Sequence, residues 1–217
     1  MFVGHLAAGF VLKSRVRAAP LGPLLAGTAL CDVVFSVLGV LGIERVTVRD
    51  PPVFANWDLA EIGYSHSLVM SLLYGVVLGV LGARWSRSRA VGIALGLAVF
   101  SHFVLDVLSH RPDMPLIGLG VAHDVKLGTN LALHPLAFFV VELACSLLAW
   151  YAYDAGNRRL LATFLALMVL WANNVFGFAL PPQPPPAGQC VLTLAAFTLA
   201  GAALWWAARS TERTVGA

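Results

Sequence analysis

The amino-acid sequence predicts an all-α protein, a polytopic bundle of six to seven transmembrane helices. The chain has 217 residues, of which 59% are hydrophobic and only 12% are charged, and its mean hydropathy is +0.82. These values lie outside the range of soluble globular domains. Lipid offers no hydrogen-bond partner to a backbone N–H or C=O, so each segment that spans it must be helical. We expect one integral membrane domain over residues 1–217.

The apolar residues fall into seven segments, most of them near the length of about 20 residues that a spanning helix needs. The first is shorter, which makes it either a tilted, re-entrant or partly interfacial helix or a seventh span. Residues 1–153 contain nearly all the ionisable groups found inside these segments, so we expect them to form the helices of the site. Residues 154–217 are predicted to form two accessory helices. The seven segments are 2–12, 21–43, 63–83, 90–108, 131–153, 160–180 and 188–208.

The connections between these segments alternate in charge. The loops 44–62, 109–130 and 181–187 are acidic, balanced or uncharged, whereas the other connections are basic. By the positive-inside rule the basic set is cytoplasmic, which predicts an outside N-terminus and an inside C-terminus. Orientation therefore explains the net charge of +3 better than nucleic-acid binding does. The basic residues are Lys13, Arg15 and Arg17, then Arg84, Arg87 and Arg89, then Arg158 and Arg159, and finally Arg209 and Arg213.

The fourth apolar segment ends in a polar stretch, 101–113, that contains the central candidate site. Here His102, Asp106 and His110 follow one another at i, i+4 and i+8, so their side chains share one helix face. Ionisable groups inside a membrane are costly and usually functional. Imidazole and carboxylate ligands favour a zinc-type or iron-type metal ion. The alternative is a buried His–Asp pair that only packs the bundle.

The predicted topology places every histidine on or near the outer leaflet. Because a metal needs three or four ligands, His66 and either His5 or His110 are expected to join His102 and Asp106 as metal ligands. The two remaining histidines have simpler interpretations: His123 as a solvated loop residue and His134 as a helix-start residue.

Two carboxylates, Asp32 and Glu142, lie about eleven residues, or ~16 Å, from the outer ends of their helices. Both are candidate catalytic bases at the floor of a pocket. Asp32 is alternatively a metal ligand. Glu142 is alternatively a partner of a metal-bound histidine or a packing group.

Several short motifs together resemble those of the LexA-regulated metal-dependent hydrolases of bacterial inner membranes. They are Gly4-His5, the mid-helix Asp32, Tyr64-Ser65-His66-Ser67-Leu68 and Ser101-His102-Phe-Val-Leu-Asp106. The continuation His110-Arg111-Pro112-Asp113, with Leu127-Gly128, His134-Pro135 and Glu142 further on, is similar to membrane proteins with an SHxxxDxxxHRPD signature. The resemblance covers about residues 1–145. It implies that His5, Asp32, His66, His102 and Asp106 form the metal and catalytic site.

One departure from the family concerns the second apolar segment. The hydrolases carry a Leu-Pro-Asp-x-Asp type segment there, whereas this chain has only Leu30-Cys31-Asp32. A single carboxylate argues against a two-metal centre.

The sequence thus predicts a membrane-embedded, metal-dependent hydrolase of the bacterial inner membrane, open toward the outer leaflet or periplasmic face. We expect one divalent metal ion, zinc, and a membrane lipid or lipid-linked ester, amide or phosphoester as substrate. One alternative is a transporter in which the histidines and carboxylates relay protons or metal ions. Another is a non-catalytic membrane scaffold.

Overall fold

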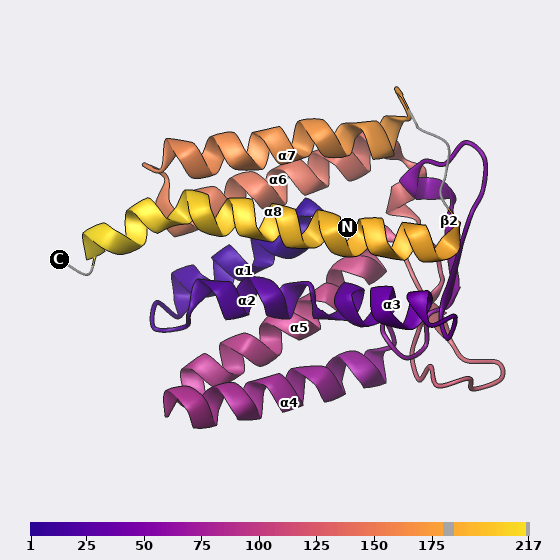
Figure 1. Cartoon of the computed structure of the whole chain (residues 1–217), viewed down its shortest axis with the longest axis horizontal. Helices are drawn as coiled ribbons and strands as arrows, with labels where there is room; N and C mark the ends of the chain where they lie inside the picture. The colour runs from indigo at the N-terminus through magenta and orange to yellow at the C-terminus, as the bar shows by residue number, and fades with distance from the viewer. Residues whose placement is uncertain (180–184, 216–217) are drawn as a thin grey trace.

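The computed structural model describes residues 1–179 and 185–215, so most of the predicted uncharged loop at 181–187 lies outside the described residues. The described chain forms a bundle of eight α-helices and two small antiparallel sheets (Figure 1). The helices are α1 (Val3–Arg15), α2 (Leu21–Thr28), α3 (Leu30–Val40), α4 (Leu68–Ser86), α5 (Arg89–Ser109), α6 (Pro135–Asp154), α7 (Arg158–Phe176) and α8 (Pro186–Val215).

Among the described residues, five helices are long and apolar enough to cross a membrane, α4 to α8. The predicted segment 21–43 is not one straight helix: α2 and α3 form a broken span bent by 51°. With its 13 residues, α1 is about 20 Å long, less than the hydrocarbon thickness of about 30 Å. The described helices are therefore those of a multi-pass membrane protein with five or six spans, and α1 is not a seventh.

The basic connections gather at one end of the bundle. The α1–α2, α4–α5 and α6–α7 turns lie there together with the end of α8 (Figure 1). Contacts between segments distant in sequence confirm this grouping: the Arg17 guanidinium lies 5.9 Å from the Tyr153 ring centroid, and that of Arg159 lies 4.1 Å from the Trp206 ring. A common end for these charges is what the positive-inside pattern requires.

The opposite end carries the two sheets, which correct the expectation of purely helical and loop structure. Strand β1 (Arg45–Val48) pairs with β2 (Trp57–Glu61), and β3 (Met114–Pro115) pairs with β4 (Lys126–Leu127). In β1 the buried Val46 alternates with exposed neighbours, the period of a half-buried strand. Two short 3₁₀ helices, η1 (Phe54–Asn56) and η2 (Leu131–Leu133), complete this end.

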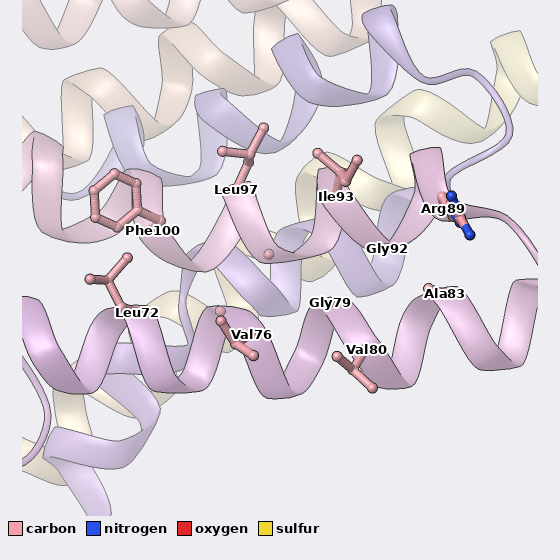
Figure 2. Close-up of a pocket in the computed structure, with 12 residues that line it drawn as sticks. Leu72, Val76, Gly79, Val80, Ala83, Arg89, Gly92, Ile93, Leu97 and Phe100 are labelled. Carbon is pink, nitrogen blue, oxygen red and sulfur yellow. The ribbon is translucent and has the colours of Figure 1, made fainter.

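Helices α4 and α5 form a closely packed hairpin whose contact is made by glycines. Both helices carry a Gly-x-x-x-Gly spacing, Gly75 with Gly79 and Gly92 with Gly96. A Cβ at Gly92 would lie 2.5 Å from the Gly79 carbonyl oxygen, so only glycine permits this approach. The outer side of the hairpin is a shallow apolar groove of about 510 Å³ (Figure 2). The hairpin fixes the start of α4, next to His66, against the helix that carries His102.

Candidate metal centre

The buried carboxylate of Asp106 is the point at which the predicted site residues meet. Its Oδ2 atom lies 3.1 Å from Nε2 of His102, one turn earlier on α5. The same oxygen lies 3.7 Å from Nε2 of His66, which precedes α4. The two imidazole Nε2 atoms are 3.2 Å apart, and all three side chains are buried. The structure therefore brings His66, His102 and Asp106 together, as the sequence predicted.

These three separations match those of metal ligands. Nitrogen ligands about 2.0–2.1 Å from a tetrahedral metal ion lie about 3.3–3.4 Å from each other. The observed separations, 3.1, 3.2 and 3.7 Å, scatter around that value. Two groups of ligand atoms are close enough to hold one ion: His66 with His102 and Asp106, and His5 with Asp32 and His102. Buried histidine and aspartate groups that can bind a metal ion are thus present.

Both imidazoles are held through the nitrogen that faces away from the centre. Nδ1 of His102 lies 2.7 Å from the Thr28 carbonyl oxygen, at the break between α2 and α3. A carbonyl only accepts, so Nδ1 carries a proton, and in the neutral tautomer with that proton the Nε2 lone pair faces the centre. Nδ1 of His66 lies 2.7 Å from the Ser65 hydroxyl. Such outer partners are typical of metal-ligating histidines.

The loop before α4 is held by a residue that the sequence analysis did not select. The buried carboxylate of Glu44 accepts hydrogen bonds from the backbone N–H groups of Tyr64 and Ser65, at 2.7 and 2.9 Å. These bonds fix the backbone that carries His66. In the sequence, the only indication of this role is an acidic residue directly after an apolar segment. That position does not identify the backbone groups that the carboxylate binds.

The second oxygen of Asp106 is surrounded by the other two predicted ligands. Nε2 of His5 lies 3.0 Å from Oδ1, and Nε2 of His110 lies 3.6 Å from it. The Met1 amine is also 3.0 Å from Oδ1. The His5 ring stacks on that of His102 with centroids 3.8 Å apart. These contacts leave Oδ2 directed toward His66 and His102.

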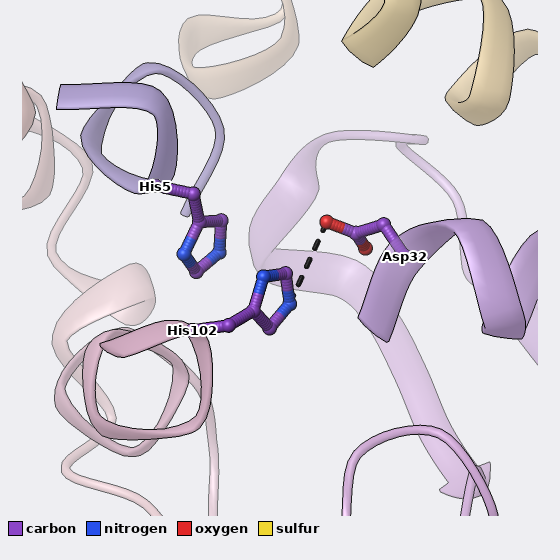
Figure 3. Close-up of side chains that lie close together, drawn as sticks. All are labelled: His5, Asp32 and His102. Atoms are coloured by element: carbon purple, nitrogen blue, oxygen red, sulfur yellow. Dashed lines mark ion pairs between the residues drawn. The ribbon is translucent and has the colours of Figure 1, made fainter. Parts of the chain in front are cut away.

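Asp32 approaches the same centre from α3. Its Oδ2 lies 3.5 Å from Nε2 of His102 (Figure 3). Its Oδ1 lies 3.6 Å from Nε2 of His66. Oδ2 is buried and has no hydrogen-bond partner within the described structure. Asp32 also lines the large cavity described below. A carboxylate beside the cluster and at the cavity wall, with one oxygen that makes no hydrogen bond, can accept a proton or bind an ion.

Glu142 has a different set of contacts. Its two oxygens accept hydrogen bonds from the backbone N–H groups of Phe2 and Gly4, both at 2.7 Å. These amides belong to the first turn of α1, where N–H groups lack partners within the helix. The contacts give Glu142 a capping role for the helix that carries His5. Its predicted role as a catalytic base stays a prediction.

We expect Glu142→Gln to lower the free energy of unfolding by about 2 kcal/mol, the scale of a hydrogen bond to a charged group. The amide can accept only one of the two N–H bonds, and its own NH₂ faces the other. Thermal unfolding in detergent measures the loss, with the exposed Glu61→Gln as the matched control. Unchanged unfolding together with lost activity would instead support the catalytic base.

A cavity of about 620 Å³ opens beside the cluster. Its polar end contains Asp32, His66, Asp106 and His110, and most of its remaining wall is apolar. Helices α7 and α8, predicted to be accessory to the site, contribute much of that wall.

Asp113 follows the end of α5, close to His110. Burial raises the pKa of the Asp113 carboxyl to about 6, and its Oδ1 lies 3.9 Å from Nδ1 of His110.

The two remaining histidines lie apart from the centre. His123 is exposed on the β3–β4 connection, and His134 is exposed at the start of α6. Both positions agree with the simpler interpretations of these residues.

No protein-family model, curated protein or solved structure matches this chain. The resemblance to membrane hydrolases therefore stays an expectation.

Proposed function

We propose that the protein is a membrane-embedded, metal-dependent hydrolase whose ion, zinc, is held by His66, His102 and Asp106. The observation that carries this proposal is the set of ligand separations, 3.1 to 3.7 Å, between three buried atoms that point at one another. Three protein ligands with one open position for water are the arrangement of catalytic zinc sites. His5 and His110 act here as positioning residues, because both contact the far oxygen of Asp106.

A bound divalent ion would polarise the scissile bond and lower the pKa of water to about 7. Within this chain Asp32 is the residue placed to take the proton. Its carboxylate lies 3.5 Å from His102 Nε2 and 3.6 Å from His66 Nε2, and its Oδ2 makes no hydrogen bond. It also borders the cavity through which a substrate would arrive. A protonated Asp32 would then return this proton to the leaving group.

The proposal places the site near the outer face of a bacterial inner membrane. The basic turns lie at the far end of the bundle from the two sheets, and the cluster lies between α1, α3, α5 and the α4 start. By the positive-inside rule the basic end is cytoplasmic, so the end with the two sheets lies on the outer side of the membrane. A lipid or lipid-linked ester, amide or phosphoester fits a polar end joined to an apolar cavity.

A proton or metal relay across the membrane is less well supported. The buried residues of α5 on the basic side of His102 are apolar: Val91, Ala94, Leu95, Ala98 and Val99, with Gly92 among them. Four of them, Val91, Ala94, Leu95 and Ala98, pack with Leu24 of α2 in one apolar cluster. A relay needs polar groups or water on both sides of the site. The scaffold alternative predicts the same contacts without bound metal.

Asp32→Asn is the variant that tests the catalytic step. If Asp32 is the base, we expect kcat to fall by about 10²–10⁴-fold, while the metal content stays that of the wild type. The assay is hydrolysis of a panel of lipid esters, lipid amides and lipid phosphoesters by zinc-loaded protein in detergent micelles. Asp58→Asn is the control, because Asp58 pairs with Arg49 outside the cluster.

Two outcomes would contradict this assignment. Full activity of Asp32→Asn would exclude Asp32 as the base. Loss of bound metal in the same variant would make Asp32 a ligand, as in the alternative group of His5, Asp32 and His102.

A further inference from the structure

The opening of the large cavity lies between two helices. Every exposed residue that lines it in the described chain belongs to α7 or α8: Leu170, Leu192, Ala196 and Leu199. Leu170 and Leu199 are each 70% exposed. We call this opening the α7–α8 cleft. Both helices are among those long and apolar enough to span a membrane, so exposed leucines in their middle turns face hydrocarbon.

The end of the cavity near the sheets is covered. Phe54 of η1 is buried, and its ring stacks on Phe138 with centroids 5.1 Å apart. The same ring lies 4.9 Å from the His110 ring and 5.4 Å from that of Trp171. Leu59 of β2 is also buried and lines the cavity. This aromatic cover separates the cluster from the aqueous side.

The two helices that border the cleft meet near the basic end and separate toward the sheets (Figure 1). At the basic end the Asn157 side chain donates to the Ala207 carbonyl at 3.1 Å, and Arg159 lies over the Trp206 ring. Further along, the cavity lies between Leu170 of α7 and Leu199 of α8. The cleft is therefore closed at one end by packing and open to the side.

We propose that the α7–α8 cleft admits one acyl chain of a membrane amphiphile from the side and presents its ester or phosphoester bond to Asp32 and His66. This inference rests on the proposed hydrolase function and adds the route by which the substrate enters. The cavity of about 620 Å³ falls within the range of about 300–1,000 Å³ typical of small-molecule sites. Its mainly apolar wall offers few hydrogen-bond partners to the polar groups of a water-soluble substrate, whereas a methylene chain needs none.

The polar groups of the cavity fit the same occupant. Asp32, His66, Asp106 and His110 gather at one end. Along α7 and α8 the wall consists mainly of leucine and alanine, with Asn174, Gln189 and Thr193 as its polar members. A molecule with one polar end and one long apolar end matches this division. The apolar groove on α4 and α5 is lined by one charged residue, Arg89, and by no histidine or carboxylate, so it is the comparison surface.

The experiment is photo-crosslinking in vesicles of phosphatidylethanolamine and phosphatidylglycerol. One phospholipid carries a diazirine at the end of a single acyl chain, and the labelled peptides are mapped by mass spectrometry. We expect labelling of α7 and α8 residues that line the cleft to exceed labelling of the α4–α5 groove. Ala196→Trp fills the cleft and should reduce this labelling several-fold. Ala195→Trp is the matched control, because Ala195 is exposed but does not line the cavity.

Equal labelling of the two apolar surfaces, or labelling that Ala196→Trp leaves unchanged, would overturn the inference. Metal content is measured on the same samples, because it tests the hydrolase proposal separately. Cleft labelling in a protein that binds no metal would support lipid entry and reject the hydrolase. A metal-loaded protein without cleft labelling would reject the lateral route alone.

Discussion

His102→Ala and Asp106→Asn are each expected to abolish stoichiometric metal binding and to reduce hydrolysis to background. His102 contributes a nitrogen within 3.2 Å of both other proposed ligand atoms, so its loss leaves only two ligands. Asp106→Asn keeps the volume and removes the charge that faces four histidines. A bound metal would stabilise the charge of the transition state by several kcal/mol, and a variant that binds no metal loses this stabilisation. Plasma mass spectrometry of detergent-purified protein, reconstituted with zinc, measures the metal.

His134→Ala is the matched control, since this histidine is exposed and its side chain makes no capping bond. Size-exclusion profiles establish that the variants remain folded. Wild-type protein that binds no metal even after reconstitution would refute the metal centre. Variants that lose only stability would then identify the His–Asp cluster as a structural scaffold.

Gly92→Ala is expected to lower the free energy of unfolding by about 3 kcal/mol, the upper range for overpacking. The new methyl group would lie 2.5 Å from the Gly79 carbonyl oxygen and 2.6 Å from the Ala83 Cβ. Neither atom belongs to a flexible side-chain end, so α4 and α5 must separate. Because α4 follows His66 and α5 carries His102, the two imidazoles should also move apart and metal affinity should fall. Thermal unfolding in detergent and zinc titration measure the two effects.

Gly201→Ala provides the control within another apolar helix. A Cβ at Gly201 meets only Leu6, at the ordinary contact distance of 3.8 Å. Alanine has the higher helix propensity, so this variant should be as stable as the wild type or more stable. Equal stability of Gly92→Ala and the wild type would show that the hairpin tolerates a wider helix spacing.

The central residues of the site could be predicted because a helix has a fixed period. His102 and Asp106 had to share a face of α5, whatever surrounded it. His66 followed from topology, since alternating spans place alternate loops at one end, whereas His5 lies on α1, which is too short to span. The basic turns gathered at one end for the same reason. The general class of the protein follows from composition, because a chain this apolar has few other stable environments.

Other features depend on contacts between distant segments. Nothing in the sequence distinguishes Glu142 as a cap of α1 from Glu142 as a base, since both roles require a buried carboxylate. The break between α2 and α3 was not predicted, although it exposes the Thr28 carbonyl that orients His102. The hairpin at 45–61 was expected to be a loop, because its pairing joins strands separated by eight residues.

By itself the sequence determined the helical class, the grouping of the basic turns and the selection of five candidate metal ligands: His5, His66, His102, Asp106 and His110. These properties depend on local period, hydropathy and charge, which any fold of the chain must respect. Only the tertiary structure decided that α7 and α8 wall the cavity, that Phe54 covers it, and that Asp32 rather than Glu142 borders it. Such relations depend on helix packing, because the same apolar residues can face either lipid or a neighbouring helix.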